Sequence, residues 1–116
     1  MEGLTDKNII VTGGASGIGK AICKRLAQEG CFIAIFDLNG DGAETTAQEI
    51  EATGGRAHGF AVDITDYQVV SDTVKQFETA VGPIHGLVNN AGWDLSMPFL
   101  ETDTRFWEKV IAINLY

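Results

Sequence analysis

The chain has 116 residues, of which 45% are hydrophobic and 21% are charged, and its formal net charge at pH 7 is −8. This length suits one compact domain or part of one, and the apolar content is enough for a core, which excludes a wholly disordered chain. The negative charge argues against binding to nucleic acid or to an anionic membrane surface, because both attract basic proteins.

The apolar residues alternate between short continuous runs and segments with a helical period. These patterns predict, in chain order, a strand at 8–12, a helix at 18–29, a strand at 31–36, a helix at 41–53, a strand at 58–62, a helix at 67–81 and a strand at 84–88. A last helix is predicted to begin near Thr102 or Thr104 and to continue to the end of the chain. This alternation is typical of an α/β fold in which helices cover both faces of a parallel sheet.

Local signals predict the ends and the buried faces of the helices. Asp41 is predicted to cap the second helix with Glu44 as its capping-box partner, and Asp66 to cap the third. The side chains predicted to face the core are Ile18, Ala21, Ile22 and Leu26 in the first helix, Val70, Val74, Phe77 and Val81 in the third, and Phe106, Val110 and Ile113 in the last.

The end of the chain carries no helix stop signal, and four strands would leave one apolar sheet edge open. We therefore expect residues 1–116 to be the N-terminal part of a single domain, truncated within a helix. No apolar run approaches the roughly 20 residues that span a bilayer, and the N-terminus lacks the features of a signal peptide, so we expect a cytoplasmic protein.

The cysteines and histidines of the chain do not indicate a metal site. Cys23 and Cys31 form no CxxC pair and lie in apolar patterns, so both are interpreted as buried thiols. His58 and His85 have no partner at ligand spacing. No metal is therefore expected.

The sequence from Thr12, which reads Thr-Gly-Gly-Ala-Ser-Gly-Ile-Gly, lies between a predicted strand and a predicted helix. Its glycines allow a sharp turn and a close approach of backbone to ligand, and the free amides and dipole of the helix start favour an anion such as a pyrophosphate. The residues predicted to bind it are Gly13, Ser16, Gly17, Ile18 and Gly19. A glycine-rich turn without a ligand is the alternative.

Asp37 closes the second predicted strand. A carboxylate there can accept hydrogen bonds from both hydroxyls of an adenosine ribose, and it repels the additional phosphate of NADP. Neighbouring Ser16, Leu38 and Asn39 offer no cation for that phosphate, so the predicted cofactor is NAD. The alternative is an aspartate that ends a strand in solvent.

Two further polar motifs follow the third and fourth predicted strands. Asp63 can contact an adenine amino group while Ile64 flanks the ring, although an Asp between a strand and a helix cap is often purely structural. An Asn-Asn-Ala-Gly sequence follows the fourth strand, where ligands of open α/β sheets bind. Its small residues Ala91 and Gly92 are predicted to leave room for a ribose, and Asn90 is predicted to bind the cofactor with them.

Taken together, these motifs resemble those of the short-chain dehydrogenase/reductase family. Residues 12–19 match its TGxxxGxG motif, Asp37 its NAD-selecting acid, Asp63 its adenine-contacting acid, 89–92 its NNAG motif and Asn114 the Asn of its catalytic tetrad. The resemblance covers the whole chain in the family's order. It implies a Rossmann-type, doubly wound parallel sheet, here with its first four strands, and reversible hydride transfer between NAD and the carbinol carbon of a secondary alcohol.

In that family a Tyr takes the alcohol proton, a Lys lowers the pKa of that Tyr, and a Ser polarises the substrate oxygen. The tetrad Asn, matched by Asn114, kinks its helix and holds a water in the proton relay. This chain contains no Tyr-x-x-x-Lys sequence. We therefore expect the chain to be the cofactor-binding half of a dehydrogenase, and we do not expect it to turn over alone.

The bulky residues after the fourth strand, among them Trp93 and Phe99, resemble those of NAD-dependent dehydrogenases of cyclic and aromatic degradation. The most similar type oxidises 2-hydroxycyclohexanecarboxyl-CoA, with aryl secondary-alcohol dehydrogenases and 3-oxoacyl-thioester reductases as alternatives. The resemblance also implies a homodimer or homotetramer. The alternative function is a non-catalytic, NAD-sensing module of the same fold. A receiver-type signalling domain is excluded, because glycines stand where its first acidic loop belongs.

Overall fold

The structure is a computed structural model that describes residues 3–90 and 111–114. Strands and helices alternate along the first of these ranges, and a further strand occupies the second. The elements are β1 (Asn8–Thr12), α1 (Gly17–Gln28), β2 (Phe32–Asp37), α2 (Gly40–Ala52), β3 (Arg56–Ala61), α3 (Tyr67–Ala80), β4 (Gly86–Asn89) and β5 (Ile111–Asn114). Within the described residues, none of the helices combines the length and apolar character that crossing a membrane requires.

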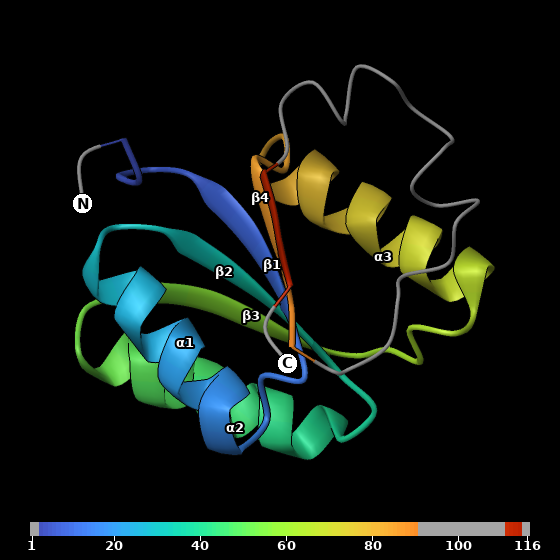
Figure 1. The fold of residues 1–116 in the computed structure, drawn as a ribbon, viewed down its shortest axis with the longest axis horizontal. Helices are drawn as coiled ribbons and strands as arrows, with labels where there is room; N and C mark the ends of the chain where they lie inside the picture. The colour runs from blue at the N-terminus through green and yellow to red at the C-terminus, as the bar shows by residue number, and fades with distance from the viewer. Residues whose placement is uncertain (1–2, 91–110, 115–116) are drawn as a thin grey trace.

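All five strands form one sheet in the order β3-β2-β1-β4-β5, and every neighbouring pair is parallel. The chain moves outward from β1 through β2 to β3 and then returns to the other side of β1 for β4. Helices α1 and α2 cover one face of the sheet and α3 covers the other (Figure 1). The predicted α/β, doubly wound, Rossmann-type fold is therefore confirmed, and the reversal of strand order lies between β1 and β4.

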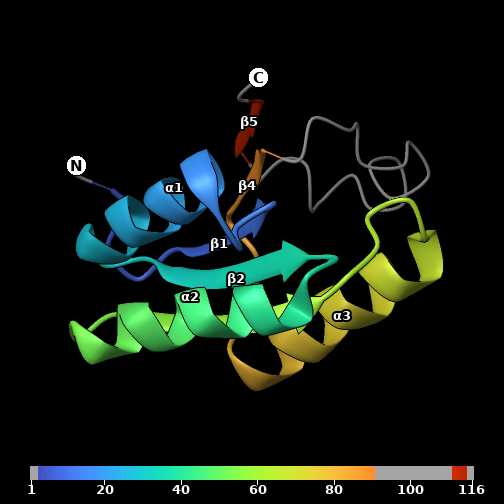
Figure 2. The same ribbon diagram turned by 90° about the horizontal axis from the view of Figure 1, so that it is seen from below.

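The core consists of two apolar layers, one on each face of the sheet. Successive residues of a strand point to opposite faces, so Ile9 and Val11 pack with the α1 and α2 layer while Ile10 packs with the α3 layer. Figure 2 shows α1 and α3 on opposite sides of the strands. Both faces of β1 are buried, which explains its continuous apolar sequence.

The end of the sheet differs from the prediction. Residues 111–114 form strand β5, which pairs with β4 so that Asn114 lies opposite Asn89, and the predicted helix is wrong at these positions. The sheet has five strands rather than four. Pairing satisfies the backbone groups along the edge of β4, and the β-branched Ile111 and Ile113 suit a strand. The rest of the predicted last helix, with Phe106 and Val110, lies outside the described residues.

The start of α2 also differs from the prediction. The helix begins at Gly40, and the side chain of Asn39 accepts a hydrogen bond of 2.9 Å from the Gly42 N–H, so Asn39 is the N-cap in place of Asp41. The predicted capping box with Glu44 is therefore wrong. In α3 the predicted cap is confirmed, because Asp66 accepts from the Val69 N–H at 3.2 Å.

The buried face of α1 agrees with the predicted one in part, because Ile22 and Leu26 pack against the core as predicted. Ile18 and Ala21 are exposed, whereas Gly19 and Cys23 are buried. The apolar pattern did not predict the burial of Gly19 in the first turn, because the residue that packs most closely at the start of the helix is a glycine. The predicted burial of Cys23 and Cys31 as free thiols is confirmed. Burial raises the pKa of the Cys23 thiol to about 12.

Candidate functional site

The loop that joins β1 to α1 turns at the carboxyl edge of the sheet. Gly13 and Gly17 have φ angles of 69° and 61°, a left-handed conformation that other residues adopt at a cost. The Gly13 N–H donates to the Phe36 carbonyl at 2.8 Å, so the loop begins as a direct continuation of the pairing between β1 and β2. The predicted glycine-rich loop therefore has the sharp turn that its sequence requires.

Gly19 allows the first turn of α1 to pack against the beginning of this loop. A Cβ atom at Gly19 would overlap the Gly13 carbonyl oxygen and would lie 2.5 Å from Nδ2 of Asn90. Any other residue would push the helix away from the loop. The third glycine of the motif is therefore explained by space, because a side chain does not fit there.

The N-terminus of α1 has no side-chain cap. Its N-cap residue, Ser16, makes no capping hydrogen bond and the first turn contains no acidic residue, whereas α2 and α3 are capped by Asn39 and Asp66. The first amides of a helix need acceptors, and the helix dipole favours a negative one. The start of α1 is therefore suited to bind an anionic group.

The end of β4 is tied to the same loop. The Asn90 side chain donates through Nδ2 to the Gly13 carbonyl at 3.3 Å, and the Asn90 N–H donates to Oγ1 of Thr12 at 3.0 Å. The Thr12 hydroxyl in turn donates to Oδ1 of buried Asn89 at 3.0 Å. These contacts lie where the strand order reverses, and they hold the carboxyl ends of β1 and β4 together.

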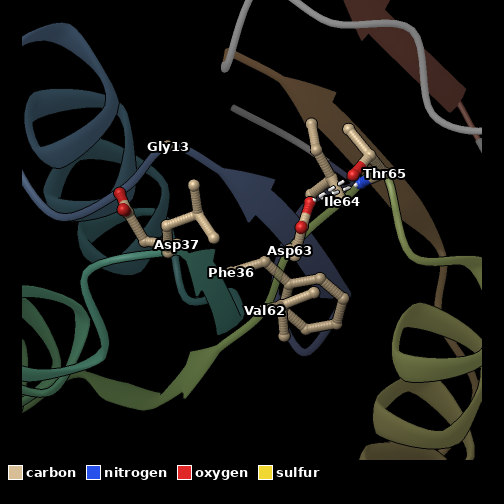
Figure 3. Close-up of a pocket in the computed structure, with 8 residues that line it drawn as sticks. Gly13, Phe36, Asp37, Val62, Asp63, Ile64 and Thr65 are labelled. Carbon is tan, nitrogen blue, oxygen red and sulfur yellow. Dashed lines mark hydrogen bonds between the residues drawn. The ribbon is translucent and has the colours of Figure 1, made fainter.

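A cavity of about 160 Å³ opens beside the loop at the ends of β2 and β3. Figure 3 shows Asp37 and Asp63 on opposite sides of it, with Phe36 and Val62 below them in this view. Among the described residues, the lining consists of Gly13, Phe36, Asp37, Leu38, Val62, Asp63, Ile64 and Thr65. The cavity thus has an apolar floor and two carboxylates at its sides, and the described residues that line it include no cation.

Asp37 connects the glycine-rich loop to the segment that follows β2. Its Oδ2 accepts from the Ala15 N–H at 3.0 Å, and its Oδ1 accepts from the Asn39 N–H at 2.9 Å. An ionised carboxylate has about four acceptor sites, so each oxygen keeps capacity for a ligand hydroxyl. The carboxylate is therefore held in a fixed orientation at the cavity before any ligand binds.

Asp63 is held by its own turn. Its Oδ1 accepts from the Thr65 hydroxyl at 2.6 Å and from the Thr65 N–H at 2.9 Å. The Thr65 hydroxyl and N–H lower the pKa of the Asp63 carboxyl, which stays ionised at neutral pH. Ile64, which follows it, is buried and lines the cavity.

The structure brings together several of the residues predicted from sequence and leaves others apart. Gly13, Asp37, Asp63 and Ile64 line the cavity, while Asn90 reaches the loop by its hydrogen bond. The other placements are as follows: Ser16, Gly17 and Ile18 are exposed at the start of α1, Gly19 is buried in its first turn, Asn114 lies in β5 opposite Asn89, and Ala91 and Gly92 lie outside the described residues.

Sequence reasoning missed Phe36, Leu38, Val62 and Thr65 as lining residues. Leu38 is 75% exposed although it is a large apolar side chain, and Ile18 in the first turn of α1 is 70% exposed. A signal for Leu38 was present in the sequence, since it directly follows Asp37. Exposed apolar groups beside a carboxylate are suited to contact the rings of a ligand.

A profile of the family described as short chain dehydrogenase matches residues 7–116. The chain belongs to the short-chain dehydrogenase family. Members of this family are oxidoreductases, and its curated relatives are named as dehydrogenases and reductases. The glycine-rich loop and the cavity described above both lie within the matched range.

Two curated relatives, both named as dehydrogenases, illustrate the similarity. The chain is 39% identical to the 2-dehydro-3-deoxy-L-rhamnonate dehydrogenase (NAD(+)) of Sphingomonas sp. over 107 residues. The matched region covers 91% of this chain and 41% of that protein. It is 39% identical over 112 residues to the D-threitol dehydrogenase of Mycolicibacterium smegmatis. That match covers 97% of this chain and 43% of the relative.

A solved structure, that of a 7α-hydroxysteroid dehydrogenase in complex with NADH and 7-oxo glycochenodeoxycholic acid, shares the fold with a TM-score of 0.72 and 36% identity. The match covers 75% of this chain and 34% of that one. The chain thus spans less than half the length of each of these three relatives.

Proposed function

We propose that this chain is the cofactor-binding part of an NAD-dependent dehydrogenase that transfers a hydride between NAD and the carbinol carbon of a secondary alcohol or ketone. The observation that carries the proposal is the arrangement at the carboxyl edge of the sheet. There, the glycine-rich loop and the fixed Asp37 carboxylate adjoin one cavity, and the uncapped start of α1 directly follows this loop in the chain. A ligand with phosphates at one position and a ribose at another fits this arrangement.

We assign each part of the cofactor to a different set of residues. The amides from Ser16 to Gly19 would bind the pyrophosphate, Asp37 the adenosine ribose, and Asp63 with Ile64 the adenine. Gly13, which lines the cavity beside Asp37, would adjoin the pyrophosphate, whereas Asn90, Ala91 and Gly92 would adjoin the nicotinamide half. NAD is favoured over NADP because a 2′-phosphate beside Asp37 would meet a carboxylate, and the part of the cavity lining that the structure describes offers no Lys or Arg to neutralise it.

When bound, NAD supplies the hydride chemistry, and this chain supplies binding and orientation. We propose that residues 1–116 are the N-terminal part of a single Rossmann-fold domain, because the chain spans less than half of its relatives. The Ser, Tyr and Lys that the family uses would come from a segment after Tyr116. Asn114, at the end of β5, is proposed as the tetrad Asn.

For the substrate we propose a cyclic or aromatic secondary alcohol, or a hydroxyacyl thioester such as 2-hydroxycyclohexanecarboxyl-CoA. The bulky sequence after β4 supports this class, and the hydroxysteroid dehydrogenase of similar fold was solved with a ring ketone. The relatives named for sugar acids and polyols make those alcohols the necessary comparison set. We also propose that the intact enzyme is a homodimer or homotetramer in the cytoplasm.

The decisive experiment is a titration of the intact protein with NAD and with NADP, for the unmutated protein, Asp37→Ala and the control Asp41→Ala. Asp41 is exposed in the first turn of α2 and does not line the cavity. We expect Asp37→Ala to weaken NAD binding about ten- to a hundredfold, because hydrogen bonds to a charged group are lost, and to reduce the preference for NAD. Asp41→Ala should bind like the unmutated protein.

Equal affinities of the unmutated protein for NAD and NADP would contradict the role of Asp37. Reduction of NAD should then be followed with ring alcohols, hydroxyacyl thioesters, polyols and sugar acids. Selective NAD binding without turnover of any of these alcohols would favour the alternative function, an NAD-sensing module of the same fold.

A further inference from the structure

The glycine-rich loop is held from the side of α2 by one buried hydroxyl. Thr46 is fully buried in α2, and its Oγ1 lies 3.0 Å from the Gly14 carbonyl oxygen and 3.4 Å from the Ala15 carbonyl oxygen. Thr46 does not line the cavity. Its hydroxyl is the donor that these two successive carbonyls of the loop share.

The same segment of the chain holds Ala15 at two further points. Asp37 accepts the Ala15 N–H at 3.0 Å, and Gly42 lets α2 approach so closely that a Cβ there would lie 2.9 Å from the Ala15 Cβ. Asp37, Gly42 and Thr46 all lie between the end of β2 and the middle of α2. The segment that carries the proposed ribose-binding acid therefore also fixes the loop proposed to bind phosphate.

The inner side of the loop is packed against apolar side chains. A Cβ at Gly14 would lie 2.6 Å from Cγ2 of Ile35 and 2.9 Å from Sγ of Cys23, so Gly14 has no room to move inward. A carbonyl in such surroundings costs free energy unless a donor reaches it. The Thr46 hydroxyl provides that donor, and its removal would favour a reorientation of the Gly14 and Ala15 peptides.

The direction of these peptides determines where their amides point. The described chain contains no cis peptide bonds, and in a trans peptide the C=O and the N–H point in opposite directions. With the Ala15 carbonyl turned toward Thr46, the Ser16 N–H of the same peptide unit points away from α2. Ser16 is the N-cap of α1, the helix end suited to bind an anion.

We propose that Thr46 is a positioning residue for the cofactor, which sets the orientation of the Gly14 and Ala15 peptides and thereby the anion-binding end of α1. This inference rests on the proposed function, because it assigns to Thr46 a part in NAD affinity. The loop has its binding conformation before the ligand arrives, so no binding free energy of NAD is lost in ordering it. Loss of the hydroxyl therefore weakens binding without touching the hydride-transfer step.

Two pairs of variants isolate the hydroxyl in the intact protein. Thr46→Val replaces the hydroxyl by a methyl group of similar size, and Thr46→Ala differs from Thr46→Ser only in the hydroxyl. The matched control is Thr45→Val, at the neighbouring exposed threonine whose hydroxyl donates to the Asp41 carbonyl of the same helix at 2.9 Å. If the buried methyl of Thr46→Val prevents folding, the comparison of Ser with Ala at this position carries the test.

We expect the dissociation constant for NAD to be roughly tenfold higher in Thr46→Val than in the unmutated protein, and roughly tenfold higher in Thr46→Ala than in Thr46→Ser. This is the change expected from the loss of one hydrogen bond. Thr46→Ser and Thr45→Val should stay near the unmutated value. In turnover assays the KM for NAD should rise while kcat stays unchanged. Unchanged NAD affinity in Thr46→Ala, or an equal loss in Thr46→Ser, would overturn the proposal, since the latter would assign the effect to methyl packing.

Amide hydrogen exchange in the absence of cofactor separates this proposal from the proposed function. Exchange at Ala15 and Ser16 should be faster in Thr46→Ala than in Thr46→Ser, while exchange at Val11 in β1 should be equal in both. If the unmutated protein binds neither NAD nor NADP, the proposed function fails. The exchange data then decide the positioning role alone, and equal exchange at Ala15 in the two variants overturns it.

Discussion

The glycines of the loop between β1 and α1 are required for different physical reasons. Gly17 needs its backbone conformation, with a φ of 61°, but an added Cβ would meet no atom within 4 Å. Gly19 has an ordinary helical backbone, but an added Cβ would overlap the Gly13 carbonyl. One motif thus combines a residue limited by conformation with one limited by space, and sequence spacing alone does not distinguish them.

This difference predicts unequal effects of two alanine substitutions on the free energy of unfolding. Gly17→Ala should lower the free energy of unfolding by about 1–2 kcal/mol, because a residue with a Cβ is strained in the left-handed conformation. Gly19→Ala should cost more, about 2–3 kcal/mol, and should also weaken NAD binding, because α1 must move away from the loop. Urea unfolding and NAD titration of both variants would test this. A Gly19→Ala protein as stable as Gly17→Ala would contradict the close packing described here.

Cys23 predicts a pH dependence of stability on the alkaline side. Burial raises its pKa from 9.0 to about 12, so between these values the unfolded chain loses the thiol proton and the folded chain keeps it. The contribution of Cys23 is therefore fully present below pH 9.0 and is lost as the pH rises toward 12. The loss can reach about 1.4 kcal/mol per pH unit.

The measurement is the free energy of unfolding against pH for the unmutated protein and for Cys23→Ala, because other groups also titrate in this range. The slope between pH 9 and 11 should be smaller in Cys23→Ala. The folded protein should also react slowly with thiol reagents at pH 8, since the thiolate is scarce and the side chain is buried. Parallel curves for the two proteins would show that Cys23 does not contribute.

At the scale of the elements, α1 differs from α2 and α3 in how its N-terminus is capped. Asn39 and Asp66 cap α2 and α3, and α1 has no side-chain cap. Asn39→Ala should therefore destabilise the protein by about 1 kcal/mol, and Asp41→Ala by only a few tenths, since Asp41 lies within the first turn. Chemical denaturation of the two variants distinguishes the caps. A larger loss for Asp41→Ala would restore Asp41 as the N-cap.

Most elements could be predicted from the sequence because their apolar runs and stop signals agree. The errors arose where two local signals compete. Asn39 and Asp41 are both good caps two residues apart, and the choice between them depends on where β2 ends. The sequence of 111–114 has apolar residues that suit either a helix face or a strand, and the open edge of β4 decides between them.

The candidate site was predictable to the extent that its residues follow strand ends. Asp37 and Asp63 close β2 and β3, and parallel strands bring such ends to one edge, so their meeting at one cavity follows from the topology. Thr46 gave no such signal, because a threonine in the middle of a helix has no pattern that marks a contact with a loop. Its role depends on how closely α2 packs against Ala15, which only the fold determines.

At the scale of the whole molecule, the sheet separates the core into two layers that share few side chains. The layer under α1 and α2 includes Ile35 and Ile50, and the layer under α3 includes Phe77 and Ile84. Gly59 brings α2 close to the sheet, since a Cβ there would lie 2.6 Å from the backbone of Ala43. Each helix layer therefore stabilises the sheet mainly through its own face.

This separation predicts additive effects across the sheet and coupled effects within one layer. Ile50→Val and Ile84→Val lie in opposite layers, should each cost about 0.5–1.5 kcal/mol, and should add to within about 0.5 kcal/mol in the double variant. Phe32 and Phe77 pack edge to face with ring centroids 5.4 Å apart, so Phe32→Leu and Phe77→Leu should be non-additive by more than about 0.5 kcal/mol. Urea unfolding of the two cycles measures both couplings. Strong coupling between Ile50 and Ile84 would mean that strain passes through the sheet from one core layer to the other.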